Sequence, residues 1–97
     1  MAITLENYDS AEHFTDPAAQ DELIRDAIEQ GDAGYLAHAI GIVLRANGMT
    51  KAQSDTGMKR QALYRAFSQA GNPTLDTFLK ALKSAGLEIT IKHATAA

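Results

Sequence analysis

The sequence predicts an all-α domain of five helices, followed by one short strand near its carboxyl end. Apolar side chains recur at three- and four-residue spacing in the helical stretches, which is the periodicity of an amphipathic helix. Residues that favour helix starts precede these stretches, and glycines follow most of them. Only residues 87–92 alternate with a period of two, as a strand does. Ninety-seven residues fit one domain, so we assign residues 1–97 to a single unit.

The composition is that of an ordinary globular protein, with 45% hydrophobic and 22% charged residues. The chain contains no cysteine, which excludes disulfides and thiol chemistry and removes the usual ligands of structural zinc. The amino terminus has no basic patch followed by an apolar run, and no stretch reaches the ~18–20 apolar residues that cross a bilayer. We therefore expect a soluble cytoplasmic protein with no membrane partner.

The first two helices are predicted over residues 17–31 and 33–47. Asp16 and Pro17 form a favourable start, since proline at the first helical position loses no hydrogen bond. Asp32 caps the second helix, which Asn47 and Gly48 end. Before them, residues 3–5 are a candidate extended segment and residues 8–14 a candidate helical turn. The apolar stripes of the two helices are Leu23, Ile24, Ala27 and Ile28, then Leu36, Ile40, Val43 and Leu44.

Two short helices joined by a tight turn are predicted over residues 49–68. Thr50 caps a helix over residues 51–55, a break follows at residues 56–58, and the next helix runs from Lys59 to about Ser68. Gly57 fits the break because a sharp reversal between helices often needs a positive φ. We expect the core side of this unit to consist of Met58, Leu63, Ala66 and Phe67.

The fifth helix is predicted to begin at Pro73, with Asn72 as its cap, and to end at Gly86. Its apolar residues Leu75, Phe78, Leu79 and Leu82 are interpreted as core. The strand that follows cannot satisfy its own backbone groups, so it needs a partner. That partner is either residues 3–5 or the same strand of a second subunit. We expect the strand to contribute to a dimer.

Charge is distributed unevenly along the chain. Residues 1–32 contain nine acids against Arg25 alone, a net of -8, whereas residues 33–97 contain eight bases against three acids, a net of +5; together they give -3. Within residues 45–65, five bases oppose Asp55. Local charge decides whether a face attracts phosphate, so two faces with different partners are consistent with this pattern. The alternative is that the acids only solvate two amphipathic helices.

Two short helices around a glycine-containing turn, the second carrying exposed cations, match a helix-turn-helix. Such a unit reads double-stranded DNA by laying the second helix in the major groove, where arginine pairs with guanine and glutamine with adenine. The preceding helix start offers backbone N–H groups to a phosphate. The alternative is a helical hairpin with a solvated basic face, in which Tyr64 is a half-buried structural residue. The candidate DNA-binding residues from this pattern are Thr50, Lys51, Lys59, Arg60, Gln61, Tyr64 and Arg65.

Several segments resemble a family of small phage-repressor-like regulators, the addiction-module antidote proteins that are usually encoded beside a small basic RelE-like toxin. The resemblance covers about residues 8–92 and is most specific where Leu63 and Tyr64 combine with residues 71–73. The matching segments are Tyr8-Asp9, Gly31-Asp32, Gly48-Met49-Thr50, Thr56-Gly57-Met58, Leu63 to Ser68, Gly71 to Thr77, Leu79 to Leu82 and Gly86-Leu87.

The resemblance implies a five-helix, phage-repressor-like domain of the Xre type. It implies a homodimer that binds a palindromic operator in its own promoter and neutralises a toxin, with Asn72 and Thr74 near phosphates. Two positions depart from the family pattern. Lys59 replaces the expected serine or threonine cap, a loss of about 0.5–2 kcal/mol. Gln53 replaces a small residue, so we expect it to change the angle between the two short helices.

Catalysis is not indicated. His13, His38 and His93 are scattered and have no partner at metal-ligand spacing, so we expect no metal and no cofactor. The recurring glycines lie within or between helices rather than in a phosphate-binding loop. A second hypothesis assigns the chain to protein interaction alone, in which the acidic residues 1–32 mask a basic partner and DNA binding is weak. The operator, the toxin and its activity, the dimer interface and proteolytic lability are not encoded in any recognisable motif.

Overall fold

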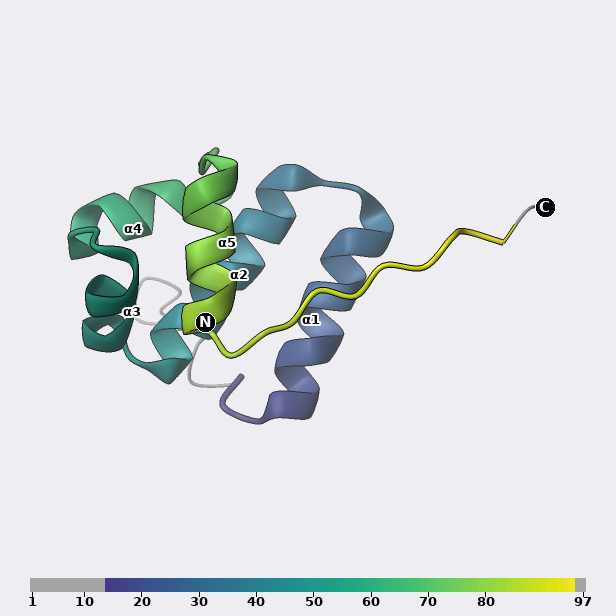
Figure 1. Cartoon of the computed structure of the whole chain (residues 1–97), viewed down its shortest axis with the longest axis horizontal. Helices are drawn as coiled ribbons and strands as arrows, with labels where there is room; N and C mark the ends of the chain where they lie inside the picture. The colour runs from purple at the N-terminus through teal and green to yellow at the C-terminus, as the bar shows by residue number, and fades with distance from the viewer. Residues whose placement is uncertain (1–13, 96–97) are drawn as a thin grey trace, which may run out of the picture.

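The computed structural model describes residues 14–95, and these residues form five helices and no strand (Figure 1). This confirms the predicted all-α class and helix number. None of the helices in the described range is long and apolar enough to cross a membrane. The helices are α1 (Pro17–Gln30), α2 (Ala33–Asn47), α3 (Met49–Thr56), α4 (Arg60–Ala66) and α5 (Leu75–Ser84).

Helices α1 and α2 form a hairpin whose limits agree with the sequence analysis. α1 has Pro17 in its first turn and ends at Gly31, whose φ of 66° lies in the left-handed region that favours glycine. The Oδ1 of Asp32 caps α2 by accepting from the backbone N–H of Tyr35 at 3.2 Å. The Tyr35 hydroxyl donates to Asp26 Oδ2 at 2.7 Å, which ties the two helices together and raises the pKa of Tyr35.

The centre of the core is α2, because the other helices pack around it. Ile40, Val43 and Leu44 are at most 1% exposed, as the predicted stripe requires. Leu63 of α4 is also 1% exposed and belongs to the same cluster, together with Leu82 of α5. The short helices are therefore held by burial against α2 rather than by their intrinsic helical propensity.

Gly41 allows the segment after α4 to lie against α2. A Cβ atom at this position would overlap the backbone carbonyl oxygen of Phe67. Gly34, two turns earlier on α2, has the same relation to the carbonyl of Gln69. Both glycines are needed for close backbone approach rather than for an unusual φ, and they fix the position of the carboxyl end of α4.

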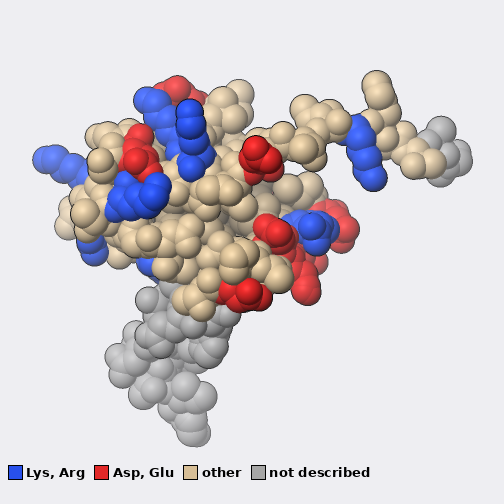
Figure 2. Space-filling view, turned by 60° about the horizontal axis from the view of Figure 1, so that its bottom comes forward, with Lys and Arg blue, Asp and Glu red and all other residues tan. Residues whose placement is uncertain are grey.

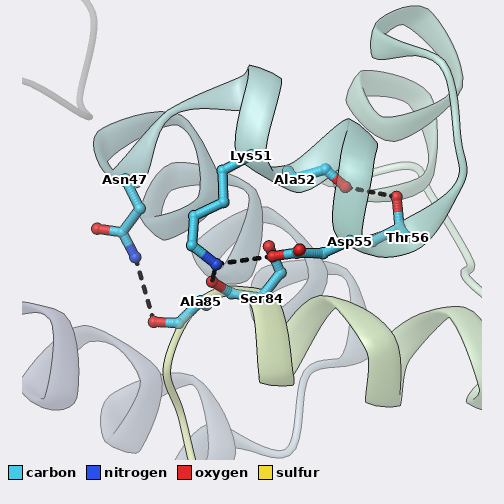
Figure 3. Close-up of polar contacts among 7 residues, drawn as sticks. All are labelled: Asn47, Lys51, Ala52, Asp55, Thr56, Ser84 and Ala85. Atoms are coloured by element: carbon cyan, nitrogen blue, oxygen red, sulfur yellow. Dashed lines mark hydrogen bonds and ion pairs between the residues drawn. The ribbon is translucent and has the colours of Figure 1, made fainter.

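Asn47, the last residue of α2, links three parts of the fold. Its Nδ2 donates to the backbone carbonyl of Ala85 at 3.1 Å, just after α5 (Figure 3). Its Oδ1 accepts from Gln20 Nε2 of α1 at 3.4 Å, and the same nitrogen donates to the Phe14 carbonyl at 2.7 Å. These bonds satisfy the amide of Gln20, which is only 6% exposed.

The predicted strand at residues 87–92 is absent from the described part of the chain. Residues 87–95 continue from α5 as an irregular, extended segment that passes α1 and leaves the body of the molecule (Figure 1). Strand formation requires a neighbouring backbone to accept and donate the ladder hydrogen bonds, and no described segment supplies one. Residues 3–5, and most of the candidate turn at residues 8–14, lie outside the described residues.

Two predictions about α5 were wrong. Leu75 is 79% exposed and Leu79 is 56% exposed, although both were assigned to the core with Phe78 and Leu82. The helix is rotated so that the small residues Ala81 and Ala85 face inward, and they allow close packing. Its start is also two residues later than predicted from Asn72 and Pro73: Thr74 is the N-cap, and its Oγ1 accepts from the Thr77 N–H at 3.1 Å.

Candidate nucleic-acid interface

Helix α3 begins at Met49, so the prediction that Thr50 caps this helix was wrong. Gly48 is the N-cap, with a φ of 108° and no side-chain cap. The helix starts two residues earlier than predicted, and Met49, its first residue, is 7% exposed and belongs to the core. The first bond across the start of α3 runs from the Ala52 N–H to the Gly48 carbonyl at 3.3 Å. The N–H groups of the three residues before Ala52 lie in the first turn, where helices leave donors unpaired.

The turn after α3 has the geometry expected from its sequence. Gly57 has a φ of 74° and donates its N–H to the Gln53 carbonyl at 2.9 Å. Thr56, which is 8% exposed, donates its hydroxyl to the Ala52 carbonyl at 2.7 Å and accepts from the Met58 N–H at 3.2 Å. The predicted core side is confirmed: Leu63 and Phe67 are buried, while Met58 and Ala66 pack against the same cluster.

Gln53 caps the next helix across this turn. Its Oε1 accepts a hydrogen bond from the backbone N–H of Arg60, the first residue of α4, at 3.1 Å. Lys59, the N-cap of α4, makes no side-chain cap. The glutamine therefore satisfies the first unpaired N–H group of α4, whereas a serine or threonine at position 59 would accept from the second or third residue of the helix. The two departures from the family pattern, Gln53 and Lys59, therefore both affect the start of α4.

All nine residues predicted to contact DNA have exposed side chains. They come from three places: the first turn of α3, the start and outer face of α4, and the loop that leads into α5. α4 is shorter than predicted, since it ends at Ala66 rather than near Ser68. The nine are Thr50 and Lys51; Lys59, Arg60, Gln61, Tyr64 and Arg65; and Asn72 and Thr74.

The ring of Tyr64 contacts another side chain of the protein and is also partly exposed to solvent. The guanidinium carbon of Arg45, at the end of α2, lies 5.9 Å from the ring centroid, which is a cation–π distance. The side chain is still 40% exposed. Arg45 therefore adds positive charge behind α4 and helps to hold Tyr64. The sequence predicted only its contribution to the local charge.

Besides Tyr64, two more of the nine side chains, Lys51 and Thr74, have partners within the protein. Lys51 Nζ lies 2.7 Å from Asp55 Oδ2 and donates to the Ser84 carbonyl at 3.3 Å, so it joins α3 to the end of α5 (Figure 3). The hydrogen bonds from Lys51 and Ser84 lower the pKa of Asp55. Thr74 Oγ1 caps α5. Lys59, Arg60 and Arg65 form no salt bridge with the described part of the chain, and they lie around α4.

The basic and acidic side chains gather at different ends of the molecule. Figure 2 shows lysine and arginine over the half that contains α3, α4 and α5, and most of the acidic side chains over the α1 half. Residues 14–32 contain six acids and one base, Arg25, a net of -5. Among residues 14–95, no group of three or more metal-ligating side chains is placed to hold a metal ion.

Comparison with known proteins identifies the family of this chain. A family model described as probable addiction module antidote protein matches residues 4–93. The chain belongs to this family. An uncharacterised protein of Haemophilus influenzae is 29% identical over 93 residues, which is 96% of each chain. No solved structure matches.

Membership of the antidote family associates the chain with toxin–antitoxin systems and implies a toxin as its partner. The match spans α1 to α5 and most of the extended tail, so the family description applies to the whole described fold.

Proposed function

We propose that this antidote protein is a helix-turn-helix regulator of the phage-repressor type that binds double-stranded DNA and represses its own promoter. The observation that supports the proposal best is the outward direction of the polar side chains of α4. Leu63 anchors the helix in the core, whereas Arg60, Gln61 and Arg65 extend into solvent. Because its buried side and its exposed polar side are distinct, α4 can enter the major groove while Leu63 stays packed in the core.

Each group has a distinct role in the proposed complex. Arg60 and Gln61, in the first turn of α4, are placed to read base edges, since arginine suits guanine and glutamine suits adenine. Lys59 and Arg65 supply charge to phosphates on either side of the groove. Asn72 and the first turn of α3 extend the phosphate contacts, because an amide and free backbone N–H groups bind phosphate oxygens.

The test is binding to a labelled fragment of the protein's own promoter, measured by fluorescence anisotropy against a scrambled fragment of equal length. Replacing both Lys59 and Arg60 with alanine is expected to lower affinity by at least about tenfold, which follows from the loss of a base contact worth ~1–3 kcal/mol. Lys92→Ala is the matched control, because it removes a positively charged side chain from the exposed tail and not from α4. Equal loss in both variants, or equal affinity for the scrambled fragment, would overturn the proposal.

The charge of α1 favours a second, compatible role. Asp21, Glu22, Asp26 and Glu29 are exposed on this helix, opposed by Arg25 alone. We infer that this acidic surface contacts the toxin, which the family resemblance describes as small, basic and RelE-like. Co-purification of the toxin with the Asp21→Asn, Glu29→Gln double variant tests this role. If that variant still binds the toxin and the Lys59, Arg60 double variant does not, the toxin contacts the basic surface around α4 rather than the acidic surface of α1.

A further inference from the structure

A groove lies between α1 and the extended residues that follow α5. Ile24 and Ile28 of α1 and Leu87 and Ile89 of the tail line a cavity of about 500 Å³. Ile28 is 60% exposed and Ile89 is 57% exposed. Isolated exposed apolar side chains are ordinary, whereas several that line one open cavity mark an interaction surface. We refer to this cavity as the tail groove.

The tail wall of the groove is fixed where it leaves α5. Gly86 has a φ of 77° and donates its N–H to the Lys83 carbonyl at 3.1 Å, and Leu87 donates its N–H to the Leu82 carbonyl at 2.9 Å. This pair of bonds is a Schellman motif, which ends the helix in a defined direction. The Leu87 side chain also packs against the core. The fold itself therefore sets where the tail runs.

Beyond Leu87 the backbone of the tail is free to pair with another strand. Residues 88–95 are extended and form no backbone hydrogen bond with the described part of the chain. Ile89 and Ile91 alternate with polar residues, and β-branched side chains in this pattern favour a strand. An extended segment with unpaired N–H and C=O groups is a template for a strand of another chain.

Acidic side chains outnumber basic ones around the tail groove. The carboxylates of Asp21, Glu29 and Glu88 line it, against the two bases Arg25 and Lys92. The whole of α1 contains four acids and one base, a net of -3. An occupant with lysine or arginine side chains is therefore complementary in charge to this groove.

The size of the groove favours an extended occupant over a helix. Asp21 and Glu29 are eight residues apart on α1, so about 12 Å of this helix borders the groove. A helix of ~10 Å diameter and that length occupies about 900 Å³, more than the groove encloses. A strand covers the same length with about four residues, at ~3.3 Å per residue.

We propose that the tail groove binds an extended, basic segment of the toxin, which adds as a strand to residues 88–92. Main-chain hydrogen bonds to the tail hold the segment, and its alternate apolar side chains contact Ile24 and Ile28. Its basic side chains lie near Asp21 and Glu29. The proposal rests on the role of the acidic α1 surface in toxin binding, and it adds the contact that orients the toxin on that surface.

The first test is calorimetric titration of the full chain with the purified toxin. The Ile28→Gln, Ile89→Gln double variant is expected to weaken binding at least about tenfold, because two apolar contacts are lost without a change of charge. Both side chains are more than half exposed, so circular dichroism is expected to show an unchanged helical content. Leu79→Gln is the matched control: Leu79 is 56% exposed but lies on α5 outside the groove, and its replacement is expected to leave the affinity unchanged.

The second test reads the strand directly, by hydrogen exchange of the backbone amides of residues 88–92 with and without the toxin. Successive N–H groups of a strand point to opposite edges, so only every second amide pairs with an added strand. We expect the toxin to slow exchange at least about tenfold at alternate residues and to change the residues between them much less.

Three results would overturn the proposal. The first is an equal loss of affinity in Leu79→Gln and the double variant, and the second is uniform exchange along residues 88–92 in the complex. The third is alternating protection already present without the toxin, which assigns the tail to a second copy of this chain. If Asp21→Asn, Glu29→Gln abolishes binding and the double variant retains it, the tail groove is excluded and the role of the α1 surface stands. If the toxin does not bind the natural chain, both fail.

Discussion

The side chain of Gln53 accepts a hydrogen bond from the backbone of Arg60 at 3.1 Å, across the turn between α3 and α4. This one contact couples the two short helices and satisfies the first N–H of α4. It gives the start of α4 a side-chain acceptor, where Lys59 provides none. The angle between the helices is thus held by a polar contact as well as by the burial of Leu63.

Gln53→Ala is expected to destabilise the protein by about 0.5–1.5 kcal/mol, the usual net value of one hydrogen bond. Urea unfolding followed by circular dichroism measures the change. Adding Lys59→Thr to this variant supplies a hydroxyl at the N-cap, so we expect it to recover part of the loss.

The control is Lys59→Thr alone. A threonine at the N-cap would accept from the N–H of the second or third residue of α4, whereas Gln53 accepts from that of Arg60, so we expect a similar gain in both backgrounds. A clearly larger gain in the Gln53→Ala variant would show that the two acceptors compete for the same N–H group.

Gly41→Ala is expected to destabilise the fold by about 1–3 kcal/mol, because the new methyl group overlaps the Phe67 carbonyl and both segments are backbone. Thermal unfolding measures the loss. Gly31→Ala is not a clean control, since Gly31 has a positive φ. Ala33→Gly, at the exposed first position of α2, tests sensitivity of the same helix without a steric overlap.

Asp55 is expected to make stability depend on pH. Its pKa is lowered below the ordinary value of 3.8, mainly by the hydrogen bond from Lys51, so the folded state keeps the carboxylate ionised where the unfolded chain binds a proton. Its contribution is present above pH 3.8 and is lost as the pH falls through the lowered value. Urea midpoints of the natural chain and Asp55→Asn should differ at neutral pH and converge in acid. A constant difference would contradict the assignment.

Lys51 and Arg65 are expected to affect DNA binding differently, although both are exposed bases. Lys51 is bound to Asp55 and to the Ser84 carbonyl, whereas Arg65 extends from α4. Removing a phosphate contact lowers the slope of log affinity against log salt concentration by about 0.9. We expect this decrease for Arg65→Ala and a smaller one for Lys51→Ala, whose main effect is on stability. Anisotropy titrations at several salt concentrations measure both slopes.

The helices could be predicted from the sequence because caps and glycines act locally. Asp32 and Gly57 have the roles that their residue types predict. The rotation of α5 could not be predicted, because Leu75 and Leu79 follow the same spacing as buried residues. Its inward face is instead set by small residues such as Ala81 that fit close to α3.

The nine candidate residues chosen from the sequence are exposed, but the side-chain contacts that support α4 were not predicted. Gln53 and Arg45 act on residues seven and nineteen positions away, Arg60 and Tyr64, and sequence periodicity contains no signal for such contacts. The strand at residues 87–92 was predicted from alternation alone. Alternation describes which side chains share a face and does not provide a hydrogen-bonding neighbour.

The close approach of residues 67–69 to Gly34 and Gly41 has an evolutionary consequence. The carboxyl end of α4 is located by main-chain atoms, and its amino end by Gln53, so the outward side chains of α4 contribute little to its placement. Substitutions at Gln61 or Arg65 can therefore accumulate without moving the helix. Under the proposed DNA-binding function, related antidotes can diverge in the sequences they recognise while retaining one scaffold, and exchanging only these outward residues between relatives should transfer recognition.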